Sequence, residues 1–106
     1  MPLHLDKMTE STWINARGEA LNVRDMADDH LSNTIRWLQR NAFPLRLRYL
    51  GEMDRYMQDA PDGAYDAAES AANDIIAMTD EQFLLFRVKP YAGMVREYAR
   101  RTAGRK

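Results

Sequence analysis

The sequence predicts a mainly α, compact domain of four to five helices with a short N-terminal β-hairpin. Apolar residues recur every three or four positions between residues 25 and 102, which is the period of an amphipathic helix. A stretch of alternating apolar and polar residues precedes them. The 106 residues are 45% apolar and 29% charged, values typical of a globular chain with one core. We expect residues 1–106 to form a single domain, with about 1–10 and 103–106 mobile.

Residues 11–24 are expected to form the hairpin. Apolar residues lie on both sides of a turn in which Gly18 supplies a positive φ. A lone hairpin is barely stable in water. The side that carries Trp13, Leu21 and Val23 should therefore pack on a helix, and Trp13 is interpreted as a core residue.

The first two helices are expected to meet at a proline. Acidic residues from Asp25 onward suit the positive end of a helix dipole, so a helix should begin there. It should end at Phe43, because a residue that precedes proline avoids the α region. Pro44 can then occupy the first position of a second helix, which should run to about Asp59.

Two or three further helices complete the predicted helical segment, 25–102. A turn at 60–63 precedes an alanine-rich helix. Thr79 and Gln82 then have the spacing of a capping box at the start of a short helix. Pro90 interrupts that helix and opens the last one.

The net charge of −1 conceals blocks of opposite sign. Residues 1–35 carry a net −3, residues 36–48 carry +4, residues 52–81 carry −8 and residues 87–106 carry +6. Such blocks can be solvated faces that pair across the fold, or a dipolar surface with separate docking faces. The sequence leaves both interpretations open.

The charge blocks indicate candidate contact residues of both signs. The basic candidates are Arg36, Arg40, Arg96, Arg100 and Arg101, and the acidic candidates are Asp59, Asp62, Asp66 and Glu69. The arginines could bind phosphates or an acidic protein patch. The acids could occupy a nucleic-acid-binding groove on another protein as a decoy for phosphate charge.

The composition gives no support for catalysis, a metal or a cofactor. The absence of cysteine excludes disulfides, zinc knuckles and thiol nucleophiles, and makes a reducing cytoplasm the default. The two histidines, His4 and His30, are too few for a recognisable metal site or a serine triad. We expect no secretory signal and no membrane-spanning stretch. We expect a cytoplasmic, non-enzymatic protein that binds no metal or cofactor.

Two segments carry a more specific pattern. They read Trp13-x4-Gly18-x5-Arg24-Asp25-Met26-x3-His30-Leu31-x-Asn33-Thr34-Ile35-x2-Leu38-x-Arg40 and Pro90-Tyr91-x2-Met94-x2-Glu97-x2-Arg100-Arg101. The pattern resembles the two ends of a family of small bacteriophage proteins. These proteins have a Trp/Gly hairpin, a Met-x-x-x-His-Leu-x-Asn-x-Ile helix and a closing Glu-x-x-Arg-Arg helix. In that resemblance His30 and Asn33 tie the hairpin to the helix. Arg100 and Arg101, as an exposed pair, become the first candidates for contact residues.

The resemblance and the charge blocks together suggest a function. The leading hypothesis is a phage accessory protein that binds and modulates or inhibits a host protein of a defence, transcription or replication complex. The alternative is a small nucleic-acid-binding module that uses Arg36, Arg40, Arg46, Arg48 and the C-terminal arginines. Either protein could be a monomer or a homodimer.

Overall fold

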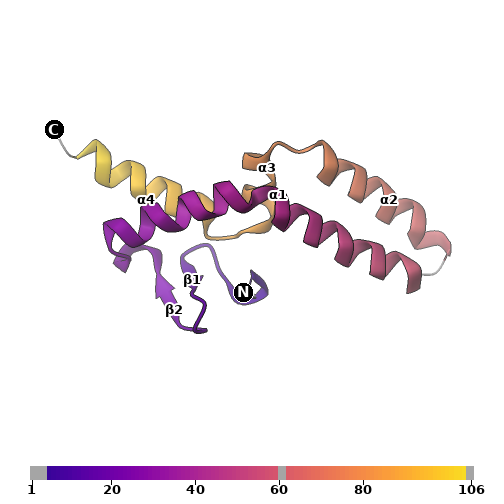
Figure 1. Cartoon of the computed structure of the whole chain (residues 1–106), viewed down its shortest axis with the longest axis horizontal. Helices are drawn as coiled ribbons and strands as arrows, with labels where there is room; N and C mark the ends of the chain where they lie inside the picture. The colour runs from indigo at the N-terminus through magenta and orange to yellow at the C-terminus, as the bar shows by residue number, and fades with distance from the viewer. Residues whose placement is uncertain (1–4, 60–61, 105–106) are drawn as a thin grey trace.

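The computed structural model describes residues 5–59 and 62–104, without the side chains of 59 and 62–65. The elements in chain order are η1 (Leu5–Lys7), β1 (Thr12–Ile14), β2 (Ala20–Asn22), η2 (Val23–Asp25), α1 (Asp28–Asp59), α2 (Asp62–Ala77), α3 (Asp80–Arg87) and α4 (Tyr91–Ala103), where η marks a single 3₁₀ turn (Figure 1). The predicted mainly α fold with a minor hairpin is confirmed.

The predicted hairpin forms, but its strands are shorter than residues 11–24, because Val23 and Arg24 belong to η2. β1 and β2 pair antiparallel with Trp13 opposite Leu21, and Gly18 has a φ of +82°. The side-chain oxygen of Asn15 closes the loop by accepting hydrogen bonds from two backbone N–H groups, those of Arg17 at 3.0 Å and Glu19 at 2.9 Å. Trp13 is buried in the core, as expected.

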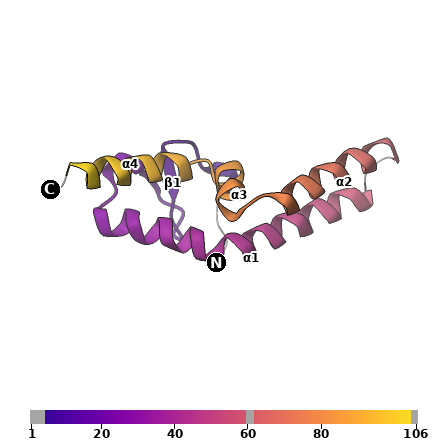
Figure 2. The ribbon, with the colours of Figure 1, turned by 90° about the horizontal axis from the view of Figure 1, so that it is seen from above.

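The prediction that a helix ends at Phe43 is wrong. α1 is one helix of 32 residues with Pro44 inside it, and it bends near its middle (Figure 2). Proline removes one backbone hydrogen bond and crowds the preceding turn, which kinks a helix without necessarily ending it. Packing on both sides of Pro44 holds the helix together, because Ala42 is buried in the core and Tyr49 packs against α3.

The N-terminal boundaries also differ from the expectation. α1 begins at Asp28 rather than near Asp25, since η2 intervenes with Asn22 as its cap. Residues 5–10, expected to be mobile, include η1 and the buried side chain of Met8. Met8 is apolar and reaches the core, so this segment is attached to the domain.

The start of α3 is confirmed in detail. Thr79 Oγ1 accepts from the backbone N–H of Gln82 at 3.1 Å, and Gln82 Oε1 accepts from that of Thr79 at 2.9 Å. This is the reciprocal capping box. Pro90 precedes α4, where Tyr91 and Met94 are fully buried.

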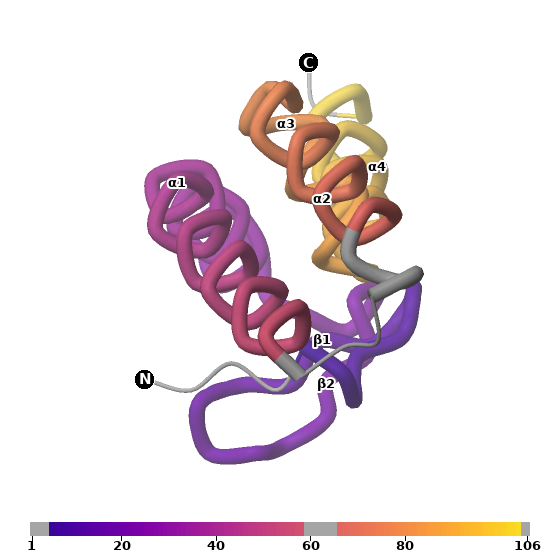
Figure 3. The backbone as a smooth tube through the Cα atoms, turned by 90° about the vertical axis from the view of Figure 1, so that its right-hand side faces the viewer, coloured from indigo at the N-terminus to yellow at the C-terminus, as the bar shows by residue number. Residues whose placement is uncertain are grey.

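The helices α2, α3 and α4 lie along the same side of α1, with the hairpin beneath (Figure 3). The main core joins the hairpin, the first half of α1, α3 and α4; its fully buried members include Leu31, Leu38, Leu84 and Val88. The molecule measures 56 × 28 × 19 Å. Its radius of gyration of 16.0 Å exceeds the roughly 13 Å of a compact domain of this length.

The elongation comes from a two-helix projection at one end of the molecule (Figure 1). We call it the acidic arm and define it as residues 50–59 of α1 together with α2. The sequence predicts an apolar stripe of Tyr65, Ala68, Ala72, Ile75 and Ile76 on α2. Ala68, Ala72 and Ile75 are half-buried or buried, whereas Ile76 is exposed, and the side chain of Tyr65 lies outside the described residues.

A joint of aromatic and arginine side chains connects the acidic arm to the core. The Tyr49 ring lies 6.1 Å from Phe83 and 5.9 Å from Phe86, and the Arg87 guanidinium lies 5.2 Å from the Tyr49 ring. Arg46 donates to Asp80 at 2.9 Å and stacks on Phe83. These contacts anchor α3 to the middle of α1, beside the bend.

Alanine substitutions at two helical glycines test how closely α4 packs on the segment before β1. A Cβ at Gly93 would lie 2.8 Å from the backbone oxygen of Glu10, whereas a Cβ at Gly51 meets nothing within 4 Å. We expect Gly93→Ala to lower the free energy of unfolding, since overpacking against backbone costs about 1–3 kcal/mol. Gly51→Ala should raise it by about 0.5–1 kcal/mol through helix propensity. Urea unfolding of both variants measures the two shifts, and equal shifts would contradict the close packing of α4 on Glu10.

Candidate functional site

The acidic arm concentrates the negative charge of the molecule. Residues 50–77 contain seven acidic residues and one basic residue, Arg55. Asp66 and Glu69 lie one turn apart on the exposed face of α2. In the part of the chain that the structure describes, neither of them forms an ion pair, nor does Asp74. The side chains of Asp59 and Asp62, the other two acidic candidates, lie outside the described residues.

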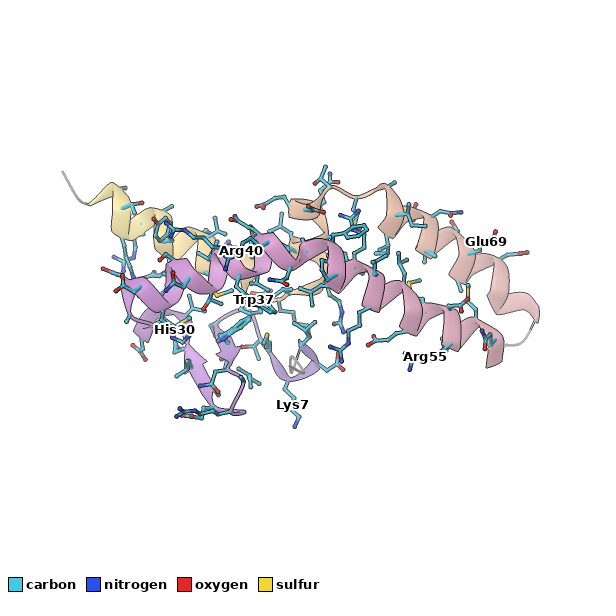
Figure 4. The ribbon with its side chains drawn as sticks, viewed as in Figure 1. Lys7, His30, Trp37, Arg40, Arg55 and Glu69 are labelled. Carbon is cyan, nitrogen blue, oxygen red and sulfur yellow. The ribbon has the colours of Figure 1, made fainter. Side chains whose placement is uncertain are left out.

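The single arginine of the acidic arm does not neutralise these carboxylates. Arg55 on α1 and Glu69 on α2 point to opposite sides of the acidic arm (Figure 4). Glu52 has a weak partner in Arg48 at 3.8 Å, and Asp54 accepts from Gln58 at 3.3 Å. The exposed face of α2 therefore carries uncompensated negative charge.

The opposite end of the molecule has a groove lined by arginines. It has a volume of about 460 Å³ and lies between α4 and the segments before β1 and after β2. We call it the arginine groove and define it by its lining residues: Glu10, Ser11, Asn22, Val23, Arg24, Gly93, Arg96, Glu97 and Arg100. Two of the predicted contact residues, Arg96 and Arg100, lie together in this groove. Arg24, which is not among the predicted contact residues, also lines it.

Glu97 anchors the arginines of α4. Only 8% of its surface is exposed, and its carboxylate accepts from Arg100 Nε at 3.1 Å, a second Arg100 nitrogen at 2.5 Å and Arg101 Nε at 3.1 Å. The hydrogen bonds from Arg100, and then those from Arg101, lower the pKa of Glu97 from 4.5 to about 2, against the opposing effect of burial. Glu97 is therefore an anion held in place by Arg100 and Arg101.

The expectation that Arg101 is an exposed contact residue is wrong. Its side chain is 14% exposed and donates to the backbone oxygens of Met26 at 2.7 Å and Arg24 at 2.9 Å, and to Asp28 at 2.9 Å. It joins α4 to η2 and to the first turn of α1. Arg100, by contrast, is 72% exposed at its side chain.

The other predicted arginines do not form one surface with the arginine groove. Arg36 lines a separate cavity of about 350 Å³ with Val95 and Tyr98. Around α4, Val95 lies about 100° and Tyr98 about 160° from Arg96. Arg40 is exposed on α1 (Figure 4).

Arg46 and Arg48, both part of the nucleic-acid alternative, are also engaged. The Arg46 side chain is 12% exposed and pairs with Asp80, while its Nε has no hydrogen-bond partner. Arg48 faces Glu52. Arg46 is therefore not available as a surface contact for nucleic acid.

The cavity beside Arg36 contains a hydrogen-bonded tyrosine. The Tyr91 hydroxyl donates to Glu81 at 2.7 Å and accepts from Gln39 at 3.2 Å. Burial, and then the hydrogen bond to Glu81, raise the pKa of Tyr91. The phenol therefore stays protonated and holds α3, α4 and α1 together.

The resemblance implies that His30 and Asn33 tie the hairpin to the helix. His30 lies in the first turn of α1 beside the hairpin loop, but among the described residues neither side chain forms a hydrogen bond to the hairpin. Together with Asn33 and Trp37 it lines a shallow apolar hollow that also includes Trp13. His30 and Trp37 are labelled in Figure 4. The backbone oxygen of His30 accepts from Thr34 Oγ1 at 2.7 Å. Across residues 5–59 and 62–104, no three histidine or acidic side chains gather in a way that could hold a metal ion.

Sequence reasoning missed Arg24 and Asn22 because their role depends on tertiary contacts. The sequence does contain one local signal, the spacing of Asn22 and Arg24. Asn22 Oδ1 accepts from the Arg24 backbone N–H at 2.9 Å, and this cap fixes the turn after β2. Only the packing of α4 brings this turn next to Arg96.

No family model, curated protein or solved structure matches the chain. Among the helices that the structure describes, none combines the length and apolar character needed to span a bilayer.

The ion pairs of Glu97 with Arg100 and Arg101 should make the stability of the fold depend on pH. The pKa of Glu97 is lower in the folded chain than the ordinary value of 4.5, so its ion pairs stabilise the fold fully above about pH 4.5 and lose this effect as the pH falls toward 2. We expect Glu97→Gln to be less stable than the wild type at pH 6. The difference in unfolding midpoint should shrink steadily between pH 4.5 and 2. Thermal unfolding of both proteins over this range measures the effect, and a constant difference would contradict the assignment.

Proposed function

We propose that the chain is a non-enzymatic bacteriophage accessory protein that acts in the bacterial cytoplasm. In this proposal it binds and modulates or inhibits a host protein of a defence, transcription or replication complex. The resemblance of the two ends of the sequence to small phage proteins supports the origin. The observation that carries the binding role is the acidic arm, because it projects from the core with uncompensated carboxylates on an exposed helix face.

The acidic arm is suited to a basic protein surface. Complementary charge raises the association rate and suppresses wrong partners. Two packed helices present Asp66 and Glu69 on a rigid scaffold, so little conformational entropy is lost when a partner binds. A groove that normally accepts nucleic acid has the charge that this surface would complement, and binding there would exclude the nucleic acid.

The partner should be captured through the acidic arm. We expect the tagged chain, purified from infected cells, to retain a host protein that Asp66→Asn/Glu69→Gln/Asp74→Asn does not retain. With the purified partner, the triple variant should bind at least tenfold more weakly, since three charge contacts are removed at about 0.5 kcal/mol or more each. The wild-type affinity should fall with added salt.

A matched variant controls for the loss of charge. Glu19→Gln/Asp25→Asn/Asp29→Asn removes three exposed acids near the hairpin instead, and its affinity should stay close to that of the wild type. If no saturable host protein is recovered, or if the two triple variants bind equally well, the role of the acidic arm is overturned.

The arginine groove favours a second candidate, the nucleic-acid-binding module. Arg24, Arg96 and Arg100 line one groove, and a cluster of guanidinium groups attracts phosphates. This candidate is weaker because Arg46 and Arg101 are engaged inside the fold and Arg36 lies on the other side of α4.

Electrophoretic mobility of DNA and RNA at low salt distinguishes the two candidates. The nucleic-acid module predicts a retarded complex that weakens steeply with salt and with Arg96→Gln/Arg100→Gln. The host-protein proposal predicts no such complex. Retardation that depends on these arginines would favour the second candidate.

A further inference from the structure

We propose that the arginine groove is a binding site for a small phosphomonoester. Arg24 reaches it from the turn after β2, and Arg96 and Arg100 reach it from α4. This inference goes beyond the proposed host-protein binding and does not rest on it, since the groove and the acidic arm lie at opposite ends of the molecule (Figure 1).

The first argument is the supply of unused hydrogen-bond donors. The side chains of Arg24 and Arg96 have no hydrogen-bond or ion-pair partner among the described residues. Arg100 uses two of its nitrogens on Glu97, which leaves donors on its exposed guanidinium. Asn22 accepts through Oδ1, so its amide N–H groups remain available. Such a donor-rich lining suits an oxyanion.

The second argument is charge. Three guanidinium groups around one groove repel each other unless an anion lies between them. Glu97 forms its ion pairs with Arg100 and Arg101, and none with Arg24 or Arg96. The three arginines of the lining outnumber its two carboxylates, and an anion bound between Arg24 and Arg96 would reduce their mutual repulsion.

The third argument is the placement of the site, which favours a small ligand over a nucleic acid. Its volume of about 460 Å³ falls in the range of about 300–1,000 Å³ that holds cofactor-sized ligands. A polymer needs a track of basic residues, but Arg36 faces a different cavity on the far side of α4. Phosphate is favoured over carboxylate because its three terminal oxygens can accept from three arginines at once.

The site is held in place by contacts within the fold. Arg101 donates to the backbone oxygen of Arg24 at 2.9 Å, which fixes the turn that carries the Arg24 side chain. Gly93 lets the segment before β1 pack closely on α4, because a Cβ at this position would lie 2.8 Å from the backbone oxygen of Glu10. The arginines thus project from a supported scaffold.

Glu10 gives the proposal an internal test. It is the acid of the lining that, in the described residues, makes no ion pair. An anion in the groove would be repelled by it. Removing this carboxylate should therefore tighten binding, whereas removing an arginine should weaken it.

The experiment is an NMR titration of the full chain with inorganic phosphate and with adenosine 5′-monophosphate. We expect saturable shifts at Asn22, Arg24 and Arg96 for both probes, and none for adenosine. Arg24→Gln and Arg96→Gln should each raise the dissociation constant about tenfold, as expected for a charge-assisted hydrogen bond. Glu10→Gln should lower it about twofold.

Arg36→Gln is the matched control, because it removes an exposed arginine outside the groove. It should leave the dissociation constant unchanged, and all four variants should keep the thermal unfolding midpoint of the wild type within a few degrees. The proposal is overturned if binding is not saturable or does not depend on Arg24 and Arg96. It is also overturned if acetate binds as tightly as phosphate, or if a single-stranded oligonucleotide binds far more tightly and requires Arg36.

Discussion

The continuity of α1 through Pro44 is the constraint on which the rest of the structure depends. A helix of 32 residues is about 48 Å long at about 1.5 Å per residue, which is most of the 56 Å length of the molecule. α2, α3 and α4 all pack on it. If the chain turned back at Pro44, the second half of α1 could fold against the core and bring its acids toward the basic residues of α4. The continuous helix instead holds the acidic arm away from them.

The charge blocks can pair across the fold or form separate docking faces, and each interpretation describes a different part of the molecule. Within the body, charges pair across the fold: Arg46 with Asp80, and Arg101 with Asp28. Pairs with low exposure at the arginine serve as attachments between elements. On the acidic arm and in the arginine groove, the charged side chains keep little or no compensation. The exposed charges that could recognise a partner are therefore found at the two ends.

Turns and helix caps that depend on residues close together in the sequence were predicted correctly. Gly18 and the Thr79–Gln82 capping box depend on the backbone within four residues, so their positions follow from residue type alone. Pro44 could not be placed in this way, because packing of the joint against α3 competes with the local preference. Arg100 and Arg101 are adjacent in sequence, yet about 100° apart around the helix. Only the position of η2 decides that Arg101 is engaged and Arg100 is exposed.

Separation along the long axis makes the two candidate surfaces electrically independent. The arginine groove and the acidic arm lie toward opposite ends of a 56 Å molecule, while exposed charges are screened over about 8 Å at physiological ionic strength. An anion in the groove would therefore have little direct effect on the field around the acidic arm. Any coupling between the two would have to pass through the packing of α4 and α3 on α1. The bend beside Tyr49 is where such coupling would act, because there the contacts of α3 join the core to the acidic arm.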